Sequence, residues 1–75
     1  MNDKGRKLIA KWIQALEDIQ SEMETMVEEE QEKFDNLSEG LQQAESGQAM
    51  EAAAATLGDV LTMLENVISE LGELA

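Results

Sequence analysis

Residues 50–71 read MEAAAATLGDVLTMLENVISEL, and their apolar side chains recur every three or four positions. Counted as heptads from Met50 at position a, this run places apolar side chains at a, d and e. Position a holds Met50, Leu57, Leu64 and Leu71; position d holds Ala53, Val60, Val67 and Leu74; position e holds Ala54, Leu61 and Ile68. A recurrence sustained over several turns predicts an amphipathic helix. We expect it over residues 47–74, with Ser46 as its N-cap.

The first half of the chain repeats this pattern. Counted from Ile9 at position a, the apolar sites are Ile9, Leu16 and Met23 at a, Trp12, Ile19 and Met26 at d, and Ile13, Val27 and Phe34 at e. This pattern predicts a first helix over about residues 3–36, with Asp3 as its N-cap.

Between the two runs, Asp, Asn, Ser and Gly cluster within residues 35–47, which is typical of a turn, and the connection is expected over about residues 37–46. Ser38 is expected to cap one short helical turn that reaches Leu41. Two long helices joined by a short connection fold back on each other. The chain is therefore predicted to be a single all-α domain, an antiparallel two-helix hairpin resembling a coiled coil. The residues expected to build its turn are Phe34, Asp35, Asn36, Leu37 and Leu41. In this turn, Asp35 and Asn36 would close the first helix by side-chain bonds to the following amides, and the two leucines would plug the end of the hairpin.

The width of both apolar stripes indicates self-association. A two-stranded seam needs apolar residues at a and d only, whereas both halves also use e. In a lone hairpin, side chains such as Trp12 would remain partly exposed to water, so we expect a homodimer that forms a four-helix bundle, or a higher helical oligomer. The residues expected at the oligomer interface are Trp12, Ile13, Leu16, Ile19, Leu61, Leu64, Ile68 and Leu71.

Composition excludes several classes of function. The chain has 75 residues, 17 acidic and 5 basic side chains, a net charge of −12, and no Cys, His or Pro. Without His or Cys, the usual zinc sites and His-based catalytic triads cannot be built. The acidic balance disfavours direct binding of nucleic acid. No apolar run is long enough for a bilayer, and the basic start lacks a signal-peptide pattern, so we expect a cytoplasmic protein and no membrane partner.

The basic residues cluster at the start of the chain, at Lys4, Arg6, Lys7 and Lys11. A cation cluster at a helix N-terminus opposes the helix dipole, so its reason must lie elsewhere. The hairpin would bring this segment beside the acidic C-terminal end at Glu70 and Glu73. Exposed ion pairs contribute only about 0–1 kcal/mol each, so this proximity selects topology more than it stabilises.

An acid-rich tract occupies residues 22–32. It lacks the Asp-x-Asp-x-Asp-Gly loop of an EF-hand, and no Glu-x-x-His pair suggests a di-iron bundle, so no metal or other cofactor is expected. The tract is either a solvated helix face or a mimic of DNA phosphates. In the second case, the candidate binding face consists of Glu24, Glu28, Glu29 and Glu32.

The stretch over residues 29–45, EEQEKFDNLSEGLQQAE, followed by the second heptad run, resembles a pattern in small uncharacterised helical-hairpin proteins of bacteria and phages. The matching residues are Phe34, Asp35, Asn36, Leu37, Glu39, Leu41 and Gln42. The pattern often has Pro where this chain has Ser38. The resemblance implies a helical hairpin and a bacterial or phage origin, and it implies no activity.

These observations favour a non-enzymatic, acidic, self-associating protein–protein interaction module with no catalytic residue. One alternative is an acidic inhibitor that mimics DNA and blocks a basic, DNA-binding or defence protein. A second is a structural assembly component that binds only itself. Trp12 is expected in the core or dimer interface, or else as the anchor for another protein, since Trp is enriched at binding hot spots.

Overall fold

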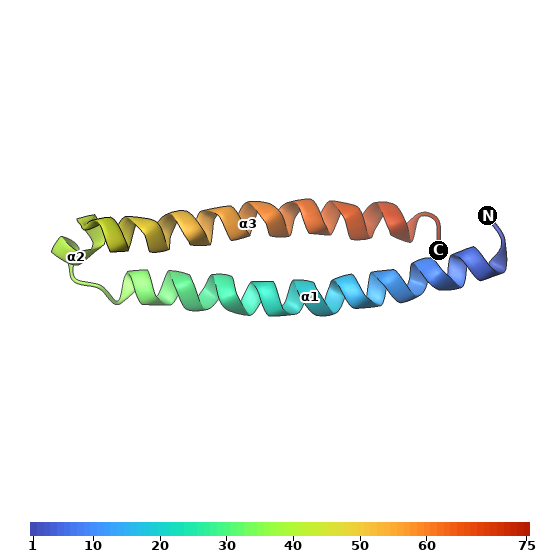
Figure 1. Ribbon diagram of the computed structural model, residues 1–75, viewed down its shortest axis with the longest axis horizontal. Helices are drawn as coiled ribbons and strands as arrows, with labels where there is room; N and C mark the ends of the chain where they lie inside the picture. The colour runs from blue at the N-terminus through green and yellow to red at the C-terminus, as the bar shows by residue number, and fades with distance from the viewer.

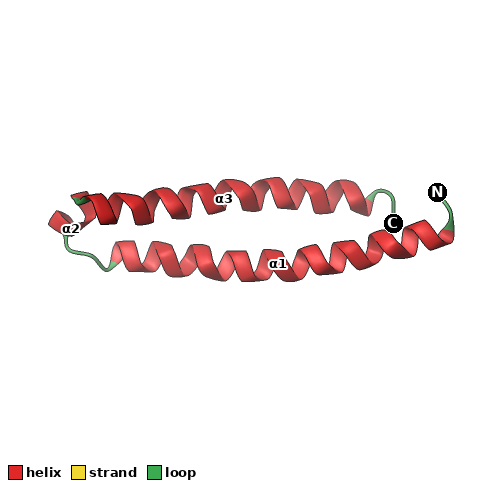
Figure 2. Ribbon diagram, viewed as in Figure 1, coloured by secondary structure: helices red, strands yellow, loops and turns green.

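The computed structural model describes residues 1–75 and contains three helices and no strand (Figure 2). Helix α1 runs from Asp3 to Asp35, the short helix α2 from Glu39 to Gln43, and helix α3 from Glu45 to Gly72. The helices α1 and α3 lie side by side in opposite directions, α2 crosses at one end, and the start of α1 extends beyond the C-terminus (Figure 1). The result is an elongated helical hairpin of 58 × 15 × 12 Å.

The first helix is capped one residue earlier than expected. Asn2, not Asp3, is the N-cap, and its Oδ1 accepts a hydrogen bond from the backbone N–H of Gly5 at 2.8 Å. Asp3 is the first helical residue, where its negative charge interacts favourably with the helix dipole.

The connection begins at Asn36, the C-cap of α1. The expected side-chain bonds from Asp35 and Asn36 to the following amides do not form. Instead, Asp35 Oδ1 accepts from Gln31 Nε2 at 3.0 Å, and the backbone N–H of Leu37 donates to Phe34 O at 3.1 Å. Helical backbone bonding therefore continues to the end of α1, where the amides of Asn36 and Leu37 donate to backbone carbonyls.

The short helix α2 has the cap that the sequence predicts. Ser38 Oγ accepts from the backbone N–H of Leu41 at 3.4 Å, and the helix extends to Gln43. The side-chain amide of Gln42 donates to Phe34 O at 3.1 Å, which ties α2 to the end of α1. On the other side, the side-chain amide of Gln48 donates to Gln42 O at 2.8 Å, which ties α2 to α3.

The last helix also begins earlier than expected. Its N-cap is Ala44, which offers no side-chain hydrogen bond, so Ser46 lies inside the first turn and is not the cap. Gly47 is buried in the same turn because the backbone of α2 passes directly over it. A Cβ atom built on Gly47 would lie 2.9 Å from Gln42 O and still closer to Leu41 O.

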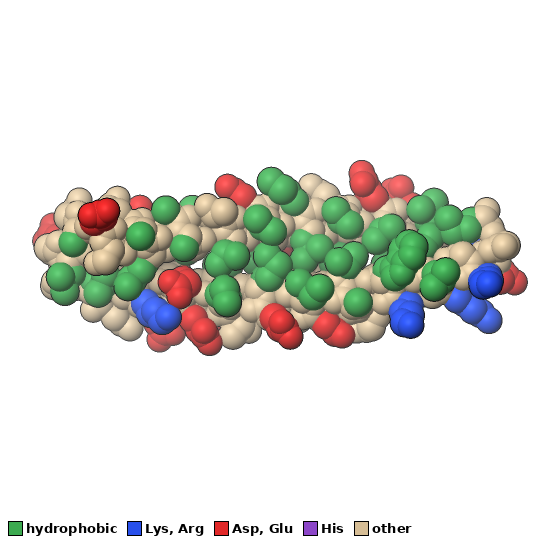
Figure 3. Space-filling view, viewed as in Figure 1, with side chains coloured by type: hydrophobic (Ala, Val, Ile, Leu, Met, Phe, Trp, Pro, Cys, Tyr) green, Lys and Arg blue, Asp and Glu red, His purple; other side chains and the backbone are tan.

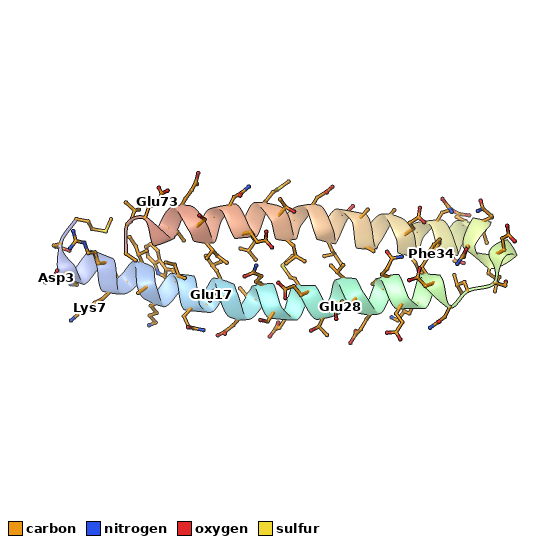
Figure 4. All side chains as sticks on the ribbon, turned by 180° about the vertical axis from the view of Figure 1, so that it is seen from behind. Asp3, Lys7, Glu17, Glu28, Phe34 and Glu73 are labelled. Carbon is orange, nitrogen blue, oxygen red and sulfur yellow. The ribbon has the colours of Figure 1, made fainter.

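The two long helices pack along positions a and e of both heptad runs. We call this packed line the seam; its members are Ile9, Ile13, Leu16, Gln20, Met23, Val27, Glu30 and Phe34 on α1, and Gly47, Met50, Ala54, Leu57, Leu61, Leu64, Ile68 and Leu71 on α3. Each of these side chains is buried or half-buried, with Ile9 and Ala54 only 3% and 5% exposed. Phe34 lies between the helices at the turn end (Figure 4).

The seam therefore follows positions a and e and not the a and d positions of an ordinary two-stranded coiled coil. An a/e line has the same alternation of three and four residues as an a/d line, so spacing alone does not choose between them. The residues at the turn end of α1 distinguish the two packing lines. At that end position d is Lys33, whereas position e is Phe34. The a/e line buries Phe34 at that end, where an a/d line would have to bury Lys33.

Two further expectations about the ends of the hairpin fail. Leu37 is half-buried, but Leu41 is 54% exposed and does not plug the turn. No ion pair joins the basic start to the C-terminal end: the two ion pairs of the chain, Arg6–Asp3 at 4.0 Å and Lys33–Glu30 at 3.1 Å, both lie within α1. Lys7 and Glu73 extend from opposite outer sides of the hairpin (Figure 4).

Candidate interaction face

Six large apolar side chains remain exposed along one side of the hairpin. They occupy the d positions of both heptad runs, and each is between 39% and 54% exposed: Trp12, Ile19 and Met26 on α1, Val60 and Val67 on α3, and Leu74 just after the end of α3. We call these six residues the apolar face. Aromatic, Met and aliphatic side chains of this kind are the ones that protein interfaces bury.

The geometry of an antiparallel pair puts all six on the same side of the seam. Within each helix, position d is next to a on one side and position b is next to e on the other. When the two helices run in opposite directions, positions with the same letter flank the seam on the same side. Hydrophobic side chains accordingly follow the groove and both helices along the whole of one broad face (Figure 3).

The opposite broad side is polar. Its b positions hold no large apolar side chain; they are Ala10, Glu17, Glu24 and Gln31 on α1, and Glu51, Gly58, Glu65 and Gly72 on α3. A Cβ atom added at Gly58 or Gly72 would meet nothing within 4 Å. The hairpin is therefore amphipathic across its thickness, with one face suited to burial and one suited to water.

The structure divides the residues expected at an oligomer interface into two groups. Trp12 and Ile19 belong to the apolar face. The other six are half-buried in the seam of a single chain: Ile13, Leu16, Leu61, Leu64, Ile68 and Leu71. The expected set omits Met26, Val60, Val67 and Leu74, which are exposed. These four residues occupy the same d columns as Trp12 and Ile19.

Two open hollows lie on the outer surface of α1. The larger, about 450 Å³, is lined by Lys4, Lys7, Leu8 and Lys11, and the smaller, about 210 Å³, by Glu29, Glu32, Lys33 and Asn36. Each is formed by neighbouring turns of one helix and not by convergence of separate elements. A surface that combines three ammonium groups with one exposed leucine is complementary to a carboxylate-rich helix.

The acidic residues of the candidate binding face, Glu24, Glu28, Glu29 and Glu32, are all exposed, and none of them forms an ion pair. No group of three or more acidic side chains converges in a way that would hold a metal ion. The hydroxyls of Thr25 and Thr62 donate to carbonyls of their own helices, at 3.1 Å to Ser21 O and 3.2 Å to Gly58 O. No helix combines the length and the apolar character that crossing a bilayer requires.

Comparisons of this chain with known protein families, with curated proteins and with solved structures find no match. The resemblance of the turn to bacterial and phage hairpin proteins therefore stays a prediction. The apolar face is the feature on which a functional argument can be built, because it is the largest departure of this surface from that of an ordinary solvated helix pair.

Proposed function

We propose that this protein is a non-enzymatic interaction module that self-associates through its apolar face, as a homodimer that forms a four-helix bundle. The observation that carries the proposal is the continuous column of exposed d residues on both helices, from Trp12 and Leu74 at the open end to Met26 nearer the turn. Burial of such a column against an equivalent one is the packing of four-helix bundles.

The dimensions suit a stable dimer. The hairpin extends 58 by 15 Å on its broad side, and a standard interface buries roughly 800 Å² per partner. Apolar burial contributes about 25 cal/mol per Å² before the costs of association are subtracted. Two copies of a chain with net charge −12 repel each other, but exposed charges are screened beyond about 8 Å at physiological salt.

Sedimentation of two matched variants tests the proposal. Ile19 is 47% exposed on the apolar face, and Leu41 is 54% exposed but lies in α2, away from that face. We expect Ile19→Gln to shift the wild-type protein from dimer toward monomer, while Leu41→Gln leaves the dimer intact. Equal helicity of both variants by circular dichroism shows that folding is preserved. A wild-type protein that sediments as a folded 8.3 kDa species at 100 μM would refute self-association.

The acidic-inhibitor alternative is favoured by one observation, the unpaired and exposed state of Glu24, Glu28, Glu29 and Glu32. Changing these four residues to Gln would abolish salt-sensitive retention on DNA-binding enzymes. A purely structural component would self-associate as well, but neither the wild type nor the variant would be retained by those enzymes.

A further inference from the structure

The charge of the hairpin is distributed very unevenly along its length. The open half, residues 1–20 and 60–75, carries four basic and six acidic side chains, a balance of −2. The turn half, residues 21–59, carries one basic and eleven acidic side chains, a balance of −10. The apolar face extends into both halves, so any partner on this face experiences both charge densities.

Two-fold symmetry allows only two ways to stack two copies through this face with full overlap. If the axis runs along the hairpin, the two turns lie at the same end and α1 packs on the partner's α3. If the axis runs across the hairpin, the turns lie at opposite ends and α1 packs antiparallel on the partner's α1. Closed two-fold arrangements are the commonest in homodimers.

We propose that the turns lie at opposite ends and that α1 packs on α1 of the second copy; this orientation rests on the proposed self-association. Each half with a balance of −10 then faces a half with a balance of −2. In the alternative arrangement the two strongly acidic halves face each other. Juxtaposed like charges cost several kcal/mol and suppress wrong arrangements, so electrostatics selects orientation even where it adds little affinity.

The same orientation gives the basic segment a partner that it lacks within the chain. Lys4, Lys7 and Lys11 form no ion pair, and the start of α1 extends beyond the end of α3 (Figure 1). Helix α1 spans residues 3–35, so its midpoint is residue 19. A two-fold axis that crosses α1 there places residues 4–11 level with residues 27–34 of the partner's α1. That segment contains Glu28, Glu29 and Glu32, which form no ion pair, together with Glu30 and Lys33, which pair with each other.

One distance measurement separates the two arrangements. The chain has no cysteine, and Gly40 lies in the exposed short helix with nothing within 4 Å of an added Cβ, so Gly40→Cys accepts a spin label without disturbing the fold. In opposite-end dimers the two labels lie about one molecular length apart, near 58 Å. In same-end dimers they are separated by about the 10 Å spacing of packed helices plus the label arms.

A long distance from pulsed dipolar spectroscopy supports the proposal. A short distance in a protein that sediments as a dimer overturns the orientation and leaves self-association standing, whereas a monomeric protein overturns both. Charge reversal gives a second readout. Lys4→Glu, Lys7→Glu and Lys11→Glu together should weaken the dimer about tenfold, and mixing this variant with Glu28→Lys, Glu29→Lys, Glu32→Lys chains should restore association as a heterodimer. Failure of the mixture to associate would contradict the pairing.

Discussion

At the scale of single residues, the close approach of α2 to α3 requires glycine at position 47. Its missing side chain leaves room for the carbonyl groups of Leu41 and Gln42. Overpacking a tight site costs about 1–3 kcal/mol, and the gain from Ala in place of Gly in a helix is about 1 kcal/mol at most. We therefore expect Gly47→Ala to lower the free energy of unfolding by about 1 kcal/mol or more in urea titrations. Gly40→Ala, in open space, is the control and should lose nothing.

Gly58 is predicted to behave in the opposite way. It lies in the middle of α3 on the polar side, and an added Cβ meets nothing within 4 Å. Gly58→Ala should raise the free energy of unfolding by about 0.5–1 kcal/mol, because Ala loses less backbone entropy in a helix. Its dimerisation constant should equal that of the wild type. A weaker dimer would mean that the second copy packs on the polar side, contrary to the interface proposed above.

At the scale of elements, the turn offers a test of the Ser38 cap. Ser38 has φ −64°, a value that proline also adopts, and its hydroxyl accepts the Leu41 amide only at 3.4 Å. Ser38→Ala removes the cap and should cost about 0.5–1 kcal/mol. Ser38→Pro also removes it but restricts the unfolded chain, so it should be more stable than Ser38→Ala by about 0.4–1 kcal/mol. Thermal unfolding of the two variants compares them directly; a less stable proline variant would mean that Leu37 cannot adopt the backbone required before proline.

The helices were predictable from sequence because their periodicity is long and uninterrupted, and the Ser38 cap because serine has few other roles before a short helical turn. The details that depend on neighbouring elements were not. Gly47 is not the first residue of the last helix, as the sequence suggested. The position is glycine because the backbone of α2 passes directly over it. The choice between a/d and a/e packing depends on what the turn can bury, and only the folded arrangement of Phe34 and Lys33 reveals it.

At the scale of the whole molecule, amphipathicity and charge act in different directions. Across the thickness of the hairpin, one broad face is apolar and the opposite one is polar. Along its length, the open half is nearly neutral in charge and the turn half is strongly acidic. In the dimer proposed above, the first separation provides the attraction between copies and the second provides their orientation. The common apolar face requires α1 and α3 to be aligned in opposite directions, whereas the uneven charge comes mainly from α1, whose basic residues gather at its start and whose acidic residues gather toward the turn.

This division of roles predicts how association responds to salt. In either orientation two copies with net charge −12 repel each other, and the attraction comes from apolar burial, which salt does not screen. The Debye length falls from about 30 Å at 0.01 M to about 8 Å at 0.15 M salt. We therefore expect the dimer to tighten as NaCl rises from 10 to 150 mM, as measured by sedimentation equilibrium. Capture of a basic partner by the acidic tract would weaken over the same range, because its attraction is electrostatic. A dimer that dissociates as salt is added would mean that ion pairs between the copies, and not the apolar face, supply most of the binding free energy.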